Sequence, residues 1–111
     1  MNKIIPAVAA AVFLLVASPA FADRIDGNWC YQDGRQMTID GPQIKTPGGT
    51  VMTGEYDRHA FRYIAPPGEG QGEPDAGAVI AMVQLNDETI NVQVGKAPAV
   101  QVWNRCKLTI S

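Results

Sequence analysis

Beyond residue 22, apolar residues recur at every second position over much of the chain, with polar residues between them. This period places successive side chains on opposite faces of a β-strand. The clearest case is 89–94, where Ile90, Val92 and Val94 alternate with polar residues and predict a half-buried strand. Further strands are predicted at 35–39, 43–46, 50–64, 78–85 and 100–108.

Two of these segments depart from simple alternation. Segment 78–85 is apolar at both parities, which is typical of a central strand that is covered on both faces. Segment 50–64 contains Gly54, and a glycine inside a strand marks a break or a bulge.

Turn-forming residues separate the predicted strands. The runs Asp33-Gly34, Asp40-Gly41-Pro42 and Pro47-Gly48-Gly49 favour tight turns, because glycine tolerates positive φ and aspartate bonds to its own backbone. No segment after residue 22 has the apolar period of an amphipathic helix. The pattern therefore predicts one all-β domain over 23–111, a small antiparallel meander that closes into a barrel or a sandwich.

The first 22 residues have the three parts of a secretory signal peptide. Lys3 supplies the positive charge, 7–17 is an uncharged apolar core, and Ala20-Phe21-Ala22 is a small-x-small cleavage site. Cleavage there gives a mature chain that begins at Asp23, with a periplasmic or secreted location and no membrane insertion after signal removal.

A membrane anchor is the alternative interpretation of the same segment. The apolar stretch 4–22 approaches the roughly 20 residues that span a bilayer. Pro6 and Pro19 interrupt it, however, so we favour the cleaved signal peptide.

Two cysteines, Cys30 and Cys106, lie near the two ends of the mature chain. Export delivers them to an oxidising compartment, which predicts one disulfide. The alternatives are two free thiols or an intermolecular bridge. Because a disulfide needs Cα atoms within about 7 Å, the bond would place the first and last strands side by side. That arrangement favours a closed barrel, with an open sandwich of paired terminal strands as the alternative.

Trp29 and Trp103 flank these cysteines in the sequence. We expect both indoles to pack around the disulfide, because tryptophan has a large apolar surface to bury. The alternative is that one indole lines the mouth of a ligand site.

The charge of the mature chain argues against a nucleic-acid partner. Lys3 is the one basic residue of the leader, so eight of the nine Lys and Arg residues and all eleven Asp and Glu residues remain, for a net charge near −3. Binding to phosphates requires clustered basic side chains.

Segment 66–77 is rich in glycine, proline and acidic residues and has almost nothing to bury. It is predicted to be a flexible loop. It is either a binding loop or lid, or a tolerated surface insertion.

Catalytic and metal-binding residues are sparse. His59 is the single histidine, Ser111 is the single serine of the mature chain, and both cysteines are expected to be oxidised. A nucleophile oriented by a histidine therefore lacks candidates. A zinc site needs three or four protein ligands, usually His, Cys or carboxylate. We expect no enzyme activity, no cofactor and no metal, with a small hydrolase that uses His59 and carboxylates as a lesser alternative.

One segment, 56–63, concentrates aromatic and basic side chains and is the candidate ligand or partner site. In an extended strand, one face would carry His59, Phe61 and Tyr63. The other face would carry Tyr56, Arg58 and Arg62. The alternative, which we favour, is that His59 and the aromatic residues pack and the arginines face water.

The sequence around the cysteines resembles a group of small exported proteins from alphaproteobacteria. The resemblance covers most of the mature chain and is carried by five runs: 27–30 (Gly-Asn-Trp-Cys), 39–42 (Ile-Asp-Gly-Pro), 46–49 (Thr-Pro-Gly-Gly), 58–61 (Arg-His-Ala-Phe) and 103–106 (Trp-Asn-Arg-Cys). It implies a periplasmic address and no particular activity. More loosely, the Trp-Cys opening on a small barrel resembles the lipocalin-like metalloprotease inhibitors of Gram-negative bacteria.

These observations together predict a non-enzymatic periplasmic binding or interaction module. Its partner is an unknown protein or small molecule. Inhibition of a protease or another hydrolase is the alternative function. A barrel interior filled with side chains would favour a protein partner over a small molecule, because a small ligand needs a cavity.

Overall fold

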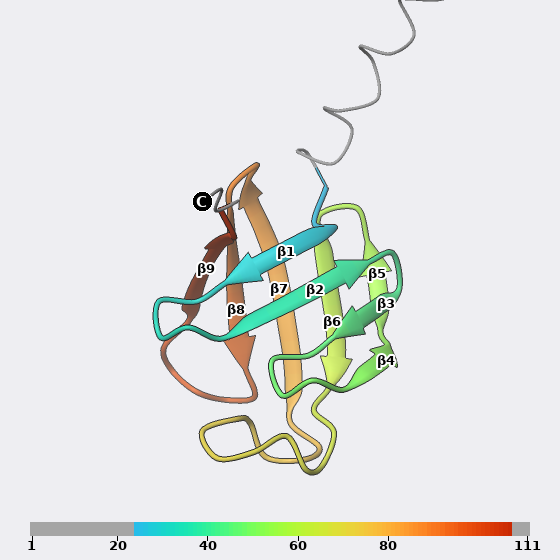
Figure 1. Cartoon of the computed structure of the whole chain (residues 1–111), viewed down its shortest axis with the longest axis vertical. Coiled ribbons are helices and arrows are strands. Elements are labelled where there is room, and N and C mark those ends of the chain that lie inside the picture. The colour runs from blue at the N-terminus through green and yellow to red at the C-terminus, as the bar shows by residue number, and fades with distance from the viewer. Residues whose placement is uncertain (1–23, 108–111) are drawn as a thin grey trace, which may run out of the picture.

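The computed structural model describes residues 24–107, so the predicted signal peptide lies outside the described part of the chain. Within these residues nine antiparallel strands form a single sheet (Figure 1). They are β1 (Gly27–Cys30), β2 (Gln36–Asp40), β3 (Gln43–Lys45), β4 (Val51–Thr53), β5 (Glu55–Asp57), β6 (Ala60–Ile64), β7 (Val79–Asn86), β8 (Thr89–Val94) and β9 (Gln101–Arg105). The all-β prediction is confirmed.

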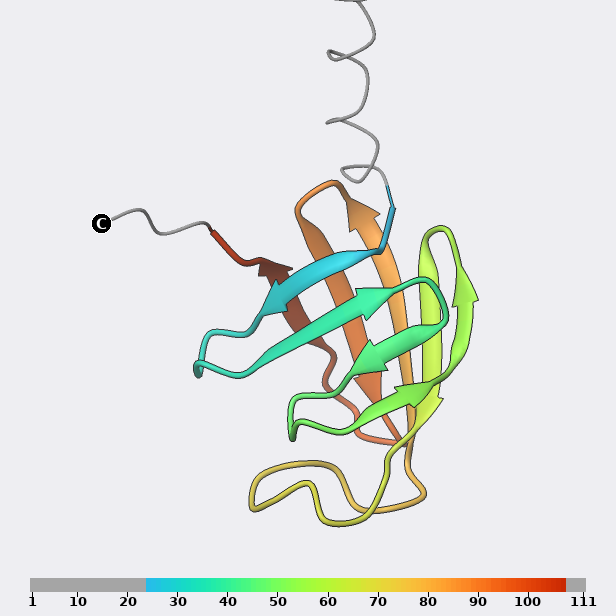
Figure 2. The ribbon, with the colours of Figure 1, turned by 45° about the vertical axis from the view of Figure 1, so that its right-hand side comes forward.

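The sheet curls into a nearly closed barrel, as Figure 2 shows. Its strand order is β4-β3-β2-β1-β9-β8-β7-β6-β5, so the first and last strands pair at its centre. The two ends of this order, β4 and β5, follow one another in the chain through Gly54. The chain therefore brings the two edges of the sheet together by bending at this glycine.

Gly54 stands where the backbone passes close to β6. A Cβ atom at this position would lie 2.5 Å from the Phe61 ring and 2.6 Å from the Arg62 carbonyl oxygen. The Gly54 N–H also donates to the Pro42 carbonyl oxygen at 2.8 Å. The predicted break at Gly54 is confirmed, and its cause is this close approach.

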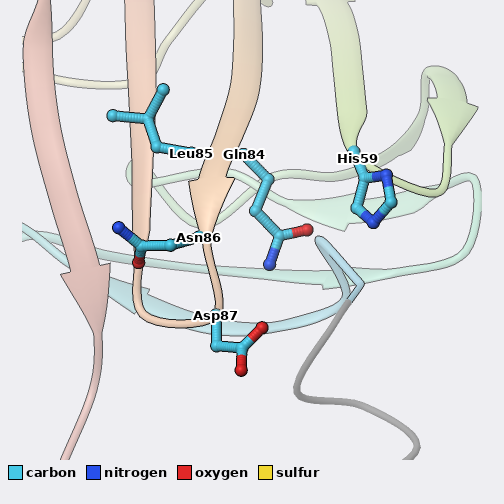
Figure 3. A pocket seen from close by; sticks show the side chains of 5 residues that line it. All are labelled: His59, Gln84, Leu85, Asn86 and Asp87. Carbon is cyan, nitrogen blue, oxygen red and sulfur yellow. The ribbon is translucent and has the colours of Figure 1, made fainter.

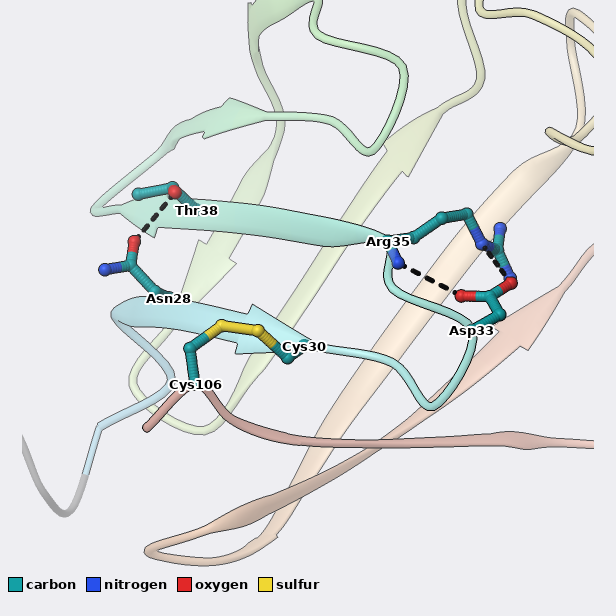
Figure 4. Close-up of a disulfide and its surroundings, with 6 residues drawn as sticks. All are labelled: Asn28, Cys30, Asp33, Arg35, Thr38 and Cys106. Atoms are coloured by element: carbon teal, nitrogen blue, oxygen red, sulfur yellow. Dashed lines mark hydrogen bonds and ion pairs between the residues drawn. A yellow bond between two sulfur atoms is a disulfide. The ribbon is translucent and has the colours of Figure 1, made fainter. Parts of the chain in front are cut away.

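The disulfide joins the first strand to the end of the last, as predicted (Figure 4). Cys30 and Cys106 have Cα atoms 5.0 Å apart, and neither cysteine is free. The Cys106 N–H also donates to the Asn28 carbonyl oxygen at 3.0 Å. The bond thus lies beside the β1–β9 pairing that closes the barrel.

The barrel interior is filled by side chains. Thirteen buried hydrophobic residues form one core; they come from Ile25, Ala65 and every strand except β4 and β5, which contribute the partly buried Met52 and Tyr56. Trp29 and Trp103 are its largest members, with 0% and 1% of their surfaces exposed. Both indoles are buried as expected, but in the core: Trp29 and Cys30 are adjacent on β1, so their side chains point to opposite faces of the strand.

Arg105 fastens the start of the described chain to the barrel. Its guanidinium donates to the carbonyl oxygens of Arg24 at 2.6 Å and Asp26 at 2.8 Å, and its Nε donates to that of Asp87 at 2.5 Å. The same group lies 4.4 Å from the centre of the Trp29 ring. One side chain therefore holds the segment before β1 against the turn between β7 and β8.

Asp26 is a buried carboxylate that ties three segments together. It accepts hydrogen bonds from the Tyr56 hydroxyl of β5 and from the Gly41 N–H, the latter at 2.8 Å. Burial alone would raise the pKa of Asp26, but these hydrogen bonds outweigh it and hold the pKa below its usual value. The folded state therefore favours the ionised carboxylate.

Acidification should destabilise the protein through this carboxylate. Because the pKa of Asp26 is lower in the folded state, its contribution is present above the unfolded pKa of about 3.9 and is lost as pH falls through the folded pKa. Asp26→Asn should lower the free energy of unfolding by about 1–3 kcal/mol at pH 7 and flatten its decline below about pH 5.

Denaturant unfolding between pH 3 and 7 measures both effects. Asp40→Asn, at an exposed position of β2, is the matched control and should leave stability and its pH profile unchanged. An Asp26→Asn profile that follows that of the wild type would contradict this role for Asp26.

Candidate functional site

The structure divides the aromatic residues of the predicted site between two strands and turns them inward. Phe61 and Tyr63 on β6 expose 1% and 5% of their surfaces and belong to the core. Tyr56 on β5 lies opposite Phe61 and uses its hydroxyl to bind Asp26. The expectation that the aromatic residues pack is confirmed, so these three residues hold the barrel together.

The basic residues of the predicted site remain at the surface in different places. Arg58 and His59 form the exposed two-residue turn between β5 and β6, so the expectation that His59 packs with the aromatic residues is wrong. Arg62 faces outward on β6, 3.8 Å from the Glu55 carboxylate. The prediction of one continuous strand through 56–63, with its two assigned faces, is wrong, because the chain reverses direction at Arg58 and His59.

The 66–77 loop crosses the lower end of the barrel in Figure 1 and is tethered there by two carboxylates. Glu69 accepts hydrogen bonds from the Gly48 N–H at 3.2 Å and from the Thr50 hydroxyl at 2.6 Å. Glu73 lies 3.4 Å from the Arg35 guanidinium, and only 8% of its side chain is exposed. The loop is thus bound at Glu69 and at Glu73 to turns in the first half of the barrel.

Arg35 joins this loop to an aromatic pair beside the β1–β2 hairpin. The rings of Tyr31 and Trp103 stack with their centres 5.0 Å apart. The Arg35 guanidinium lies 5.1 Å and 5.5 Å from these two ring centres. It also pairs with Asp33 at 2.9 Å (Figure 4). The loop is therefore held by a cluster in which every named side chain has a structural partner.

The outer side of β6, β7 and β9 carries exposed apolar side chains. Five large apolar side chains there are 38–54% exposed. We name them the apolar face: Ile64, Val79, Val83, Leu85 and Val102. They lie on the strand positions that alternate with core residues such as Ile80, Met82 and Trp103.

The strand register pairs some of these side chains directly and separates others by a polar residue. Ile64 on β6 lies opposite Val79 on β7. Val83 lies opposite Asn91 of β8, which in turn lies opposite Val102 of β9. Arg62 is the one charged residue among the outward positions of β6 to β9.

The apolar face corrects the prediction for segment 78–85. The inner face of β7 is buried as expected, with Ile80 and Met82 at 2% and 1% exposure. Its outer face is uncovered in the described part of the chain, with Val83 and Leu85 both 54% exposed. The prediction that both faces are covered is wrong, because the barrel wall is a single sheet without a second layer over β7.

Two of the hollows that border the apolar face are lined by residues of β7. One, of about 380 Å³, lies over the small side chains Ala60 and Ala81 and is flanked by Val83 and Arg62. The other, of about 260 Å³, lies between the β5–β6 turn and the β7–β8 turn (Figure 3). Its lining residues are His59, Gln84, Leu85, Asn86 and Asp87.

Across 24–107, no three His, Cys, Asp or Glu side chains are grouped so that they could bind a metal ion. None of these residues belongs to a helix with the length and hydropathy needed to span a bilayer.

Comparison with known proteins yields no relative. No protein-family model, no curated protein and no solved structure matches this chain.

Proposed function

We propose that this protein is a non-enzymatic, exported interaction module that binds a partner protein through the apolar face. The observation that carries the proposal is the exposure of Ile64, Val79, Val83, Leu85 and Val102 on one side of a small barrel. Exposed apolar surface of this kind is costly in water and marks a surface that a partner covers.

The filled interior supports a protein rather than a small molecule as the partner. Small-molecule sites are usually concave cavities that enclose most of the ligand. Here the barrel axis is occupied by large side chains such as Trp29, Phe61 and Trp103, each at most 1% exposed. Binding is therefore assigned to the outside of the barrel.

The composition of the apolar face also matches that of protein interfaces. The centres of such interfaces are depleted in charged residues. The outward residues of β8 between the two apolar strands are Thr89, Asn91 and Gln93, which are polar but uncharged. Arg62 lies at the side of this surface, where a charged residue can guide the orientation of a partner.

Photo-crosslinking in the source cells tests the proposal. A photoreactive phenylalanine at position Val83 should form a covalent adduct with a partner protein. The same residue at position Val51 should not, although Val51 is 66% exposed, because it lies on β4 outside the apolar face. Equal adducts at both positions, or none at Val83, would contradict the proposal.

Introducing a charge into the apolar face should weaken the binding of the partner. With the photoreactive residue at position Val102, Val83→Glu should reduce the adduct about tenfold, because a charge buried without a partner is costly. Val51→Glu is the control and should leave the adduct unchanged. Both substitutions lie at exposed positions, so each should change the free energy of unfolding by no more than about 0.5 kcal/mol.

A further inference from the structure

The 380 Å³ hollow on the outer side of β5, β6 and β7 adjoins the apolar face. Ala60 on β6 lies opposite Val83 on β7, and Arg62 lies opposite Ala81. The two alanines are therefore diagonal neighbours between two large side chains, and the space above their methyl groups forms the hollow. Because Val83 also belongs to the apolar face, a partner that covers this face covers the hollow as well.

The two sides of the hollow differ in their chemistry. On the β5 side, Glu55 and Asp57 are two residues apart and exposed, so both carboxylates lie on the outer face of the strand. On the β7 side, Val83 forms an apolar wall that is 54% exposed. A group that fills the hollow therefore meets apolar atoms below it and on one side, and carboxylates on the other.

The charges around the hollow leave one carboxylate without a counterion. Arg62 lies 3.8 Å from the Glu55 carboxylate and offsets its charge. The Asp57 side chain forms no ion pair or hydrogen bond with another residue in 24–107. Two carboxylates and one guanidinium give the hollow a net charge of −1, which a single positive charge would neutralise.

Arginine is the residue type that fits this combination of surfaces. Its methylene groups can pack on apolar atoms while its guanidinium stays at the edge of the hollow. The guanidinium can donate two parallel hydrogen bonds to one carboxylate and is less strongly hydrated than the ammonium of lysine. An aliphatic or aromatic side chain would fill the hollow but would leave Asp57 without a partner in an interface, which is costly.

We propose that this hollow receives an arginine side chain of the partner protein, with its methylene groups on Ala60 and Ala81 and its guanidinium at Asp57. This inference rests on the proposed function and adds to it the side chain that gives the docking surface its specificity. Arginine is also among the residue types that contribute most to the affinity of protein interfaces.

Two short peptides test the hollow without the partner protein. Acetyl-Leu-Arg-Leu-amide and acetyl-Leu-citrulline-Leu-amide have the same size, but citrulline has a neutral urea in place of the guanidinium. In ¹⁵N-labelled protein at physiological ionic strength, the arginine peptide at millimolar concentration should shift the backbone amides of Ala60, Ala81 and Val83. The citrulline peptide at the same concentration should shift them about threefold less. No shifts at these amides, or citrulline shifts of equal or greater size, overturn the proposal.

Asp57→Asn removes the carboxylate and keeps the size of the side chain. It should reduce the shifts with the arginine peptide to those with the citrulline peptide. Asp40→Asn removes the same charge from an exposed position of β2 and should leave the shifts unchanged. Equal reductions in the two variants would show only a general attraction between a cation and an acidic protein, and they overturn the proposal. Shifts that persist in Asp57→Asn overturn it as well.

Ala81→Leu fills the hollow without changing the charge. It should abolish the shifts at Ala60 and Val83, and a well-dispersed ¹⁵N spectrum would show that the variant is folded. Ala60→Val makes the same test from β6 if Ala81→Leu does not fold. Shifts that remain in a folded variant with a filled hollow overturn the proposal.

The crosslinking assay extends the test to the partner protein and separates the two proposals. With the photoreactive residue at position Val102, Asp57→Asn should reduce the adduct about fivefold, and Asp40→Asn should not change it. If adducts form at Val83 but the arginine peptide is not preferred, the apolar face stands and the arginine site is rejected. If the arginine peptide is preferred but no adducts form at Val83, the hollow stands as an arginine site and the apolar face is rejected as its docking surface.

Discussion

Replacing Cys30 and Cys106 together with alanine should lower the free energy of unfolding by about 4 kcal/mol. The bond closes a loop with a sequence separation of 76 residues, and the chain-entropy estimate for loops of this length is about 4 kcal/mol. Domains of this size are stable by about 5–15 kcal/mol in total. The loss should be visible as a large shift of the denaturant midpoint.

Reduction of the wild type provides the control for this substitution. Reduced wild-type protein and the double alanine variant should unfold at the same denaturant concentration, because both lack the same cross-link. A loss of less than about 1 kcal/mol in both would show that β1 and β9 hold together without the bond.

Trp29→Ala should cost about 3–5 kcal/mol, the range found for removing a buried aromatic side chain from a core. The Trp29 side chain is fully buried, and its indole N–H donates to the Ile25 carbonyl oxygen at 2.8 Å. Its ring also packs against the Arg105 guanidinium. The substitution therefore opens a cavity and unpairs the Ile25 carbonyl at the same time.

Thermal and denaturant unfolding measure this loss. Trp29→Phe should fall between the wild type and Trp29→Ala, because it keeps an aromatic ring but not the hydrogen bond. Val51→Ala, at a 66% exposed position, should change the free energy of unfolding by no more than about 0.5 kcal/mol. A Trp29→Ala loss as small as that of Val51→Ala would contradict a central role for Trp29.

The sequence predicted those parts of the fold in which one residue pattern has one structural meaning. Strict alternation defined the strand at 89–94, which is β8 to the residue. Two cysteines near the ends of the predicted mature chain predicted the closure of β1 on β9. The indoles beside them had too much apolar surface to remain outside a small core, and both are buried.

The hairpin between β5 and β6 escaped prediction because its turn lacks a sequence signal. Two-residue hairpin turns favour glycine, asparagine and aspartate, which adopt positive φ readily. Arg58 and His59 at this turn belong to none of these types. Alternation in the sequence therefore continues through the turn, and the predicted site joins side chains that the structure separates.

The apolar run at 78–85 contributes to the apolar face, but by itself it does not show whether the outer side of the strand is covered. An apolar run at both parities fits a strand covered on two sides, and it fits equally a strand with one side in the core and the other awaiting a partner. The two cases differ in whether a second layer of structure covers the outer side of the strand. Such a layer depends on contacts between segments that are distant in the sequence. The tethers of Glu69 and Glu73 are of the same kind, since their partners lie 19 to 38 residues away.

The closure of the barrel also has a consequence for how the chain folds. Of the eight strand pairings in the described residues, seven join strands that are consecutive in the chain, six through short turns or loops and β6–β7 through the longer 66–77 loop. The β1–β9 pairing alone requires the two ends to find each other, and the entropy of such a search grows with the length of the intervening chain. The disulfide keeps these ends together in the unfolded chain as well, so an oxidised chain that unfolds can refold with every strand pairing effectively local.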